Sequence, residues 1–165
     1  MSSNVITVEV IWSVLDDVKD PEIPVVSVIE MGIVREVRLS QDVTHAVVTM
    51  TPTFVGCPAL IPMREEIIKC IRALGVAHVE VKVALNPPWT SQWITEGARV
   101  KLKSIGFAPP PQHTGKIDMA LLRQAVCPNC DSSDTVLDNM FGPTACRALY
   151  YCNHCKQSFE QFKPL

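Results

Sequence analysis

Residues 50–62 of the chain read Met50-Thr-Pro-Thr-Phe-Val-Gly-Cys57-Pro-Ala-Leu-Ile-Pro62. This stretch follows an alternating, strand-like run and opens the longest helical pattern in the sequence. Proline is favoured at the first position of a helix, so Pro58 predicts that Cys57 lies at a helix N-terminus. The helix that follows is expected to bury one apolar face, which consists of Leu60, Ile61, Ile67, Ile68, Ile71 and Leu74.

The predicted position of Cys57 has a chemical consequence. Unpaired backbone N–H groups and the positive end of the helix dipole favour the thiolate form of a cysteine. A thiolate attacks electrophiles and binds soft metals, whereas a neutral thiol does neither well. The alternative interpretation is a buried cysteine that fills space as a small apolar residue. Position alone leaves both interpretations open.

The composition favours a folded protein that does not bind nucleic acid. Of the 165 residues, 47% are hydrophobic and 19% are charged, which is enough to build a packed core. Residues 1–108 carry 10 Lys and Arg against 12 Asp and Glu, and residues 109–165 carry 5 against 5, which gives the totals of 15 and 17. Nucleic-acid binding relies on a basic surface that neutralises phosphates, and neither part of the chain is basic.

The seven cysteines favour reduced thiols or metal ligands over a disulfide framework, because their number is odd and the N-terminus shows no secretion signal. No apolar run approaches the ~18 residues that a membrane span requires. We therefore expect a cytoplasmic protein.

The regions around residues 50–62 predict a small α/β (α+β) domain over residues 1–108, in which a three-stranded sheet packs against helices. A helical pattern covers Val8 to Val18, and a second one starts at Thr90 and includes Trp93, Ile94, Ala98, Val100, Leu102 and Ile105. Gly75 is expected to end the helix that follows Cys57. Trp89 is expected either to pack in the core or, if exposed near Cys57, to contribute to a docking surface. Strands are predicted at 33–39, 46–50 and 78–85.

A rigid loop, Asp20-Pro-Glu-Ile-Pro24, carries two carboxylates between prolines. Such acids are ordinarily solvated, but two fixed carboxylates can also hold a metal or act as bases. His45 and His78 stand alone at the starts of predicted strands, and we expect both at the surface.

The composition changes after the domain. Residues 109–125 form a Pro-rich linker with a short helix, and residues 126–165 contain Cys127-Pro-Asn-Cys130 and Cys152-Asn-His-Cys155. Two such Cys-x-x-Cys knuckles complete a tetrahedral thiolate site, so the sequence predicts a zinc ribbon whose fold depends on the metal. A redox-active thioredoxin-type pair is the weaker alternative. His154 is expected to be a solvent-facing spacer, and Cys146 a packed residue outside the site.

Two stretches resemble a known family. Asp20-Pro-Glu-Ile-Pro-Val-Val-Ser-Val-Ile-Glu-Met-Gly-Ile-Val34 and Thr51-Pro-Thr-Phe-Val-Gly-Cys-Pro58 are similar to the signatures of the MIP18-like (DUF59) domain, which is associated with iron–sulfur and iron-protein maturation. The ribbon, together with Asn86-Pro-Pro-Trp-Thr-Ser-Gln-Trp-Ile-Thr95 and Phe141-Gly-Pro-Thr-Ala-Cys146, resembles the PaaD family of small accessory subunits of bacterial phenylacetyl-CoA epoxidases, also called oxygenases.

This resemblance implies a non-catalytic maturation factor for a di-iron oxygenase of phenylacetate degradation. The factor would handle iron or an iron–sulfur cluster through Cys57, with Asp20, Glu22, Thr51 and Thr53 beside it. Zinc ligands would be Cys127, Cys130, Cys152 and Cys155. Partners would be subunits of the phenylacetyl-CoA oxygenase or of its iron–sulfur reductase. One thiolate is too few for a stable cluster, which usually takes four protein ligands, so a bridge across a homodimer with labile or external ligands would suit transfer.

The sequence itself agrees that the protein is not the oxygenase. It lacks the Glu-x-x-His helix motifs of a carboxylate di-iron site and the glycine fingerprint of a dinucleotide-binding reductase. A structural subunit of the oxygenase with Cys57 as packing is the first alternative. A thiol-dependent enzyme is the second, although no histidine stands out as the base that such a nucleophile needs.

Overall fold

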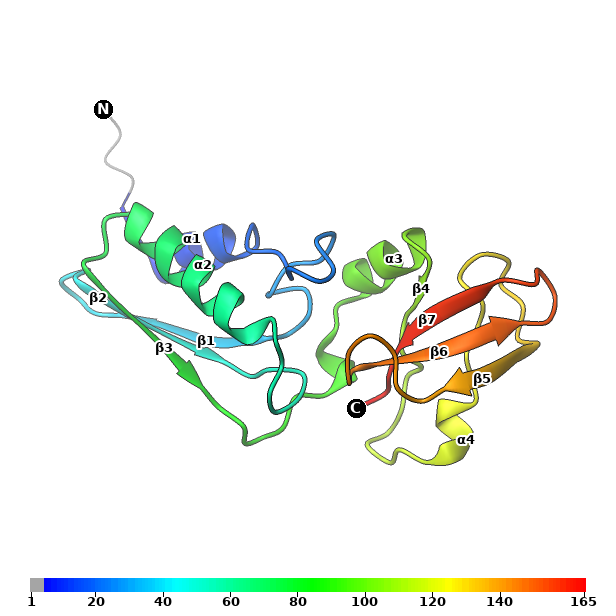
Figure 1. The fold of residues 1–165 in the computed structure, drawn as a ribbon. Helices are drawn as coiled ribbons and strands as arrows, with labels where there is room; N and C mark the ends of the chain where they lie inside the picture. Colours follow the sequence, from blue (N-terminus) through cyan, green and yellow to red (C-terminus); the bar gives the residue numbers. More distant parts are fainter. Residues whose placement is uncertain (1–4) are drawn as a thin grey trace. The chain divides into compact units, whose positions relative to one another are not determined.

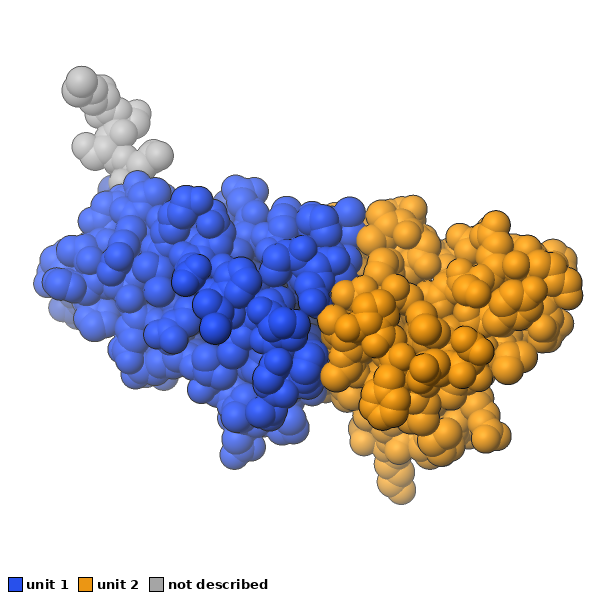
Figure 2. Space-filling view, in the orientation of Figure 1, with its two compact units in different colours: residues 1–89 blue, residues 90–165 orange. Residues whose placement is uncertain are grey.

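The computed structural model describes residues 5–165, and the chain divides into two compact units at Trp89 and Thr90 (Figures 1 and 2). The predicted boundary at residue 108 lies well inside the second unit. Within the described residues, no helix is long and apolar enough to cross a membrane.

The first unit is a three-stranded sheet with two helices on one face (Figure 1). Its elements in chain order are α1 (Val8–Leu15), β1 (Val34–Leu39), β2 (His45–Met50), α2 (Leu60–Ala73) and β3 (His78–Val83). Strands β1 and β2 form an antiparallel hairpin, and β2 pairs in parallel with β3 after the crossover through α2. The predicted sheet is therefore confirmed, with β2 at its centre.

Alternation and helical periodicity explain the core of this unit. Helices α1 and α2 bury Ile11, Leu15, Met63, Ile67 and Ile71 against Val37, Ala46, Val48, Met50 and Val81 of the sheet. The predicted apolar face of α2 is only partly correct. Ile61 is 67% exposed, while Met63 takes the buried position one half-turn further on. Gly75 ends α2 as predicted, with φ +104° and its N–H donated to the Arg72 carbonyl.

The second unit is built on a four-stranded sheet in the order β4-β7-β6-β5. It contains a 3-10 turn (Ser91–Trp93), α3 (Glu96–Ser104), β4 (Phe107–Ala108), α4 (Met119–Leu122), β5 (Thr135–Asn139), β6 (Arg147–Cys152) and β7 (Ser158–Phe162). Strands β5, β6 and β7 are antiparallel neighbours. The two-residue strand β4 pairs in parallel with β7, so the segment just before the predicted linker is part of the sheet.

The helix predicted from Thr90 is interrupted. Ile94 is extended (ψ 124°), and the Thr95 hydroxyl then accepts the Ala98 N–H at 3.2 Å and starts α3. Arg99 of α3 is buried and donates to the carbonyls of Ser91 (2.8 Å) and Pro110. These bonds tie α3 and the proline segment into the second unit, which explains why the boundary differs from the predicted one.

Candidate metal sites

Four cysteines converge at one end of the second sheet. The Sγ atoms of Cys127, Cys130, Cys152 and Cys155 all lie within 4.8 Å of one another. Cys127 and Cys155 are 3.6 Å apart at sulfur, and so are Cys130 and Cys152. Each close pair joins one knuckle to the other. The structure thus brings together all four of the cysteines that the sequence predicts as metal ligands.

The two knuckles share one backbone design. The carbonyl of Cys127 accepts the Asp131 N–H at 2.9 Å, and the carbonyl of Cys152 accepts the Lys156 N–H at 3.0 Å. Asp131 and Lys156 both adopt positive φ, 59° and 60°. This left-handed residue closes each turn and places the two sulfurs of a knuckle on the same side.

The electrostatics of the cluster favour a cation. Burial opposes ionisation of Cys152, but N–H groups of Cys155 and His154 lower the pKa of its thiol to about 6. Burial and the neighbouring thiols Cys152, Cys127 and Cys130 raise the pKa of Cys155 to about 12. Without a metal, ionisation of one thiol makes ionisation of the next one less favourable, because the negative charges repel each other. A bound divalent cation offsets this repulsion.

The sulfur arrangement fits a tetrahedral metal ion. With Zn–S bonds of about 2.3 Å, a regular tetrahedron sets its sulfurs about 3.8 Å apart, close to the 3.6 Å of the two measured pairs. The cluster is also part of the core of the ribbon. Cys127 and Cys152 are fully buried beside Tyr150 and Phe159, whose rings stack at 5.6 Å.

Cys57 lies in the loop between β2 and α2. Helix α2 begins at Leu60, and its N-cap is Ala59, which makes no side-chain capping bond. The Cys57 carbonyl accepts the Leu60 N–H at 3.1 Å, so Cys57 belongs to the turn before the helix rather than to its N-terminus. Its side chain is half-buried. Cys57 is therefore partly exposed, but the helix begins two residues later than Pro58 predicted.

The other residues predicted beside Cys57 have distinct local roles. Asp20 is 8% exposed, and its Oδ1 accepts the N–H groups of Glu22 (2.8 Å) and Ile23 (3.2 Å), so this carboxylate holds its own loop. Glu22 is exposed. Thr51 is buried and continues the sheet through its N–H bond to the Ile33 carbonyl, while Thr53 is half-buried.

Within residues 5–165, the cysteine cluster of the ribbon is the one group of three or more His, Cys, Asp or Glu residues positioned to hold a metal.

Sequence reasoning missed the exposure of apolar residues close to Cys57 in the chain. Val55 is 79% exposed and Ile61 is 67% exposed, one on each side of Cys57 in the chain. Leu85, at 52%, lines a shallow pocket together with Val55 and Thr51. Exposed apolar side chains that share one patch, as Val55 and Leu85 do at this pocket, are typical of contact surfaces. Periodicity assigned Ile61 to the buried face of the helix, so its exposure could not be predicted from the sequence.

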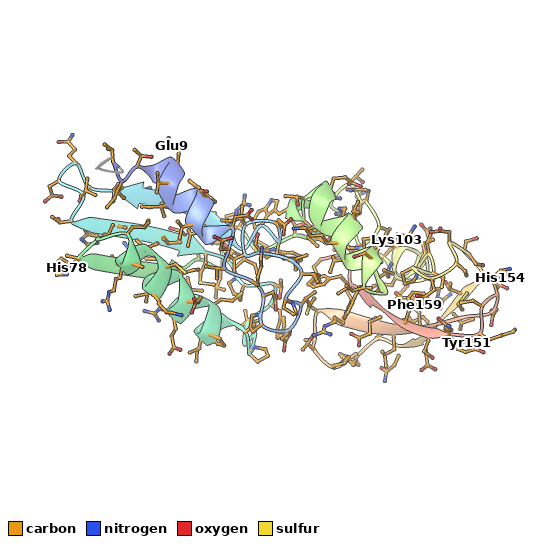
Figure 3. All side chains as sticks on the ribbon, turned by 90° about the horizontal axis from the view of Figure 1, so that it is seen from above. Glu9, His78, Lys103, Tyr151, His154 and Phe159 are labelled. Atoms are coloured by element: carbon orange, nitrogen blue, oxygen red, sulfur yellow. The ribbon has the colours of Figure 1, made fainter. Side chains whose placement is uncertain are left out.

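The remaining expectations concern single residues. Trp89 is buried, and its Nε1–H donates to the Met31 carbonyl at 2.9 Å, so it serves as core rather than as a docking surface. His45 and His78 are exposed, as predicted, and pair in register across β2 and β3. His154 is exposed at the second knuckle (Figure 3). Cys146 is buried, with its Sγ 3.1 Å from the Thr144 hydroxyl, and lies outside the metal-ligand group.

Comparison with protein-family models matches each unit separately. Residues 9–83 match the iron–sulfur cluster assembly protein family, and residues 112–163 match the PaaD zinc beta ribbon domain. The first match spans the three-stranded sheet, its helices and the loop that carries Cys57. The second match spans both knuckles.

Two individual relatives match the chain over different shares of its length. The chain is 39% identical to a subunit of the "Putative 1,2-phenylacetyl-CoA epoxidase" of Escherichia coli strain K12, over 93% of this chain and 90% of that protein. It is 35% identical to "Fe-S protein maturation auxiliary factor YitW" of Bacillus subtilis strain 168, over 57% of this chain and 91% of that protein.

A solved DUF59 domain from Bacillus anthracis superposes with a TM-score of 0.53 and 30% identity, over 57% of this chain and 89% of that one. A conserved hypothetical protein from Thermotoga maritima gives 0.51 and 28%, over 59% and 94%. Since the match to the Escherichia coli protein extends over nearly the full length of both chains, the chain belongs to the PaaD family, in which an iron–sulfur cluster assembly domain of the MIP18-like type precedes a zinc ribbon.

Proposed function

We propose that the protein is a non-catalytic maturation factor of a phenylacetyl-CoA oxygenase, and that Cys57 handles iron or an iron–sulfur cluster as cargo. The names of the two relatives support this assignment, since one is an epoxidase subunit and the other an Fe–S maturation factor. The first unit matches the iron–sulfur assembly family, and Cys57 lies within the matched residues.

The observation that carries the proposal is the setting of Cys57. Cys57 is half-buried on a loop whose tip, Val55 and Gly56, is exposed. Neither Asp20 nor Glu22 joins it in a group of three metal-ligating side chains within the described residues. A stable cluster usually takes four protein ligands, so in this proposal ligands from outside the chain would complete the site. Such a partial site favours transfer, because the client protein can replace the outside ligands one at a time.

The cysteine cluster of the ribbon has a different role in this proposal. Four thiolate ligands occupy all four positions of a tetrahedral metal ion, which is typical of structural zinc. The metal would hold the two knuckles together, and through Cys127 and Cys152 it would stabilise the core that contains Tyr150 and Phe159.

The client is proposed to be a subunit of the oxygenase or its iron–sulfur reductase. Val55, Ile61 and Leu85 would contact the client, because their exposed apolar side chains provide area that becomes buried on docking. The rival function is a structural subunit in which Cys57 only packs.

Co-expression distinguishes these functions. Oxygenase and reductase subunits are produced with the wild-type protein, with Cys57→Ser, or with the control Cys70→Ser. Cys70 is half-buried on α2, where burial and then the Glu66 carboxylate raise the pKa of its thiol. With Cys57→Ser, the complex should assemble with reduced iron content and little activity, while Cys70→Ser should match the wild type. Full activity with a folded Cys57→Ser protein would support the structural subunit instead.

A further inference from the structure

Strand β3 forms one edge of the first sheet, since it comes last in the strand order and pairs with β2 on one side only (Figure 1). The N–H groups of His78, at the start of β3, and of Ala84, just after its end, donate toward β2. Because N–H and C=O groups alternate sides along a strand, those of Val79, Val81 and Val83 point away from β2. In the described part of the chain, no further strand pairs with this edge.

The two edges of this sheet differ in how they are protected. Strand β1 has an irregular register with β2 between Val34 and Glu36, and bulges of this kind discourage pairing at a sheet edge. Strand β3 runs in unbroken register with β2 over all its six residues. Val83 is 42% exposed and Val79 is half-buried, so this edge also presents apolar side chains. A regular apolar edge is a template for pairing with another strand.

The sequence of β3 indicates which strand would complement it. Residues 79–83 read Val-Glu-Val-Lys-Val, which is the same in both directions except that glutamate and lysine exchange places. In an antiparallel pair of two copies centred on Val81, each valine therefore lies opposite a valine. Glu80 of each copy then lies opposite Lys82 of the other, and such opposite-charge pairs stabilise neighbouring strands.

Hydrogen bonding and charge both favour this register. Residues that lie opposite each other in an antiparallel pair point their N–H groups the same way relative to the edge, which excludes a centre between two residues. A centre at Glu80 or at Lys82 would place that charge opposite its own copy, and like charges directly opposite each other are destabilising. Both side chains are available for the contact, since Glu80 is 51% exposed and Lys82 57%.

We propose that β3 is a dimerisation edge, on which two copies of the chain pair antiparallel about Val81 and join their sheets into one. The two-fold axis makes each favourable contact occur twice. This dimer does not rest on the proposed handling of iron. Strands β2 and β3 are parallel, and Cys57 follows the end of β2, so the two Cys57 loops would lie at opposite ends of the paired strands. No cluster would bridge them.

The test is sedimentation equilibrium of the full-length, zinc-loaded protein without iron. The wild type should dimerise. Lys82→Glu should raise the dissociation constant of the dimer about 2- to 30-fold, because two cross-strand pairs worth about 0.2–1 kcal/mol each are lost. The double variant Glu80→Lys/Lys82→Glu should restore the dimer, since it exchanges the charges and keeps the register. Arg38→Glu is the control, because it reverses the same charge in the Glu36–Arg38 ion pair of β1, the other edge strand.

NMR locates the contact. The amides of Val79, Val81 and Val83 should gain protection from exchange as the protein concentration rises. A mixture of labelled and unlabelled protein should show a cross-copy NOE between the Hα protons of Glu80 and Lys82, which approach closely in a non-hydrogen-bonded pair.

Several results would overturn the proposal. These are a protein that stays monomeric at about 1 mM, a dimer that Lys82→Glu and Arg38→Glu affect equally, and a double variant that fails to restore the dimer. A dimer that forms only with iron would instead be bridged through Cys57. Protection of the β3 amides only in the presence of an oxygenase subunit would show that a client strand, rather than a second copy, occupies this edge.

Discussion

The sulfur atoms of Cys127 and Cys155 lie 3.6 Å apart, although 28 positions separate the two residues in the chain. This contact closes the β5-β6-β7 sheet at one end and joins the first knuckle to the second. Because both sulfurs belong to the ribbon's core or its edge, the state of the metal site and the folding of the ribbon should be inseparable.

The first prediction concerns zinc. The purified protein should contain about one zinc per chain, and Cys127→Ser should lose both the metal and the amide-exchange protection of residues 126–165. Cys146→Ser should keep its zinc, because Cys146 lies outside the ligand group. Elemental analysis and hydrogen exchange measure the two effects. A zinc-free protein with a protected ribbon would contradict the metal-dependent fold.

The second prediction concerns Tyr150 at high pH. This side chain is buried and donates its hydroxyl to the Leu122 carbonyl, and burial raises its pKa to about 12. Between the ordinary tyrosine pKa of about 10 and this raised value, the folded state holds the proton more tightly than the unfolded state. The free energy of unfolding should therefore fall as the pH rises through this window.

Absorbance titration of tyrosinate measures the effect, since the chain contains two tyrosines. Tyr151→Phe should leave the late-titrating group in place, and Tyr150→Phe should remove it. At neutral pH the loss of this hydrogen bond should cost about 0.5–1.5 kcal/mol. Ionisation of Tyr150 in the folded protein near its ordinary pKa would contradict the buried hydrogen bond.

The third prediction concerns the division between the units. Burial lowers the pKa of the Arg99 guanidinium, which donates to the carbonyls of Ser91 and Pro110. Arg99→Met should reduce the free energy of opening of the second unit by about 3 kcal/mol, because hydrogen bonds to charged groups are worth about 1.5–3 kcal/mol. Lys101→Met on the same helix removes an exposed cation and serves as the control.

Hydrogen exchange of the full chain measures the opening free energies. Residues 90–165 should lose protection in Arg99→Met, and residues 5–89 should not. Equal loss in both regions would show that the boundary at Trp89 does not separate two cooperative units.

Local signals account for what the sequence predicted well. Alternation predicted β1, β2 and β3, Gly75 predicted the end of α2, and the spacing of the knuckles predicted the metal-ligand group. Each of these depends on residues close together in the chain.

The errors arise from long-range contacts. The helix predicted from Thr90 breaks at Ile94. Three residues earlier, the Ser91 N–H donates to the carbonyl of Leu165 at the other end of the unit. Strand β4 exists only because β7 pairs with it, and a two-residue strand before a proline segment has no periodicity to detect. The exposure of Val55 and Ile61 was likewise invisible, because an apolar residue at a binding surface and one in the core look the same in a sequence.

The effect of replacing Cys57 follows from its place in the turn. Ala59, not Cys57, caps α2, so Cys57→Ser removes no helix cap. Serine also keeps the size of the side chain while removing the soft thiolate. The variant should therefore fold and bind zinc in its ribbon like the wild type, which makes it a clean probe of the first unit.

The most direct measurement is the iron and sulfide bound by the full-length, zinc-loaded protein after anaerobic reconstitution with Fe²⁺ and sulfide. The wild type and Cys70→Ser should both bind labile iron beyond their zinc, and Cys57→Ser should not, at equal zinc content and equal stability. Equal iron binding by Cys57→Ser and the wild type, or no iron binding by either, would contradict the claim that Cys57 handles iron or an iron–sulfur cluster.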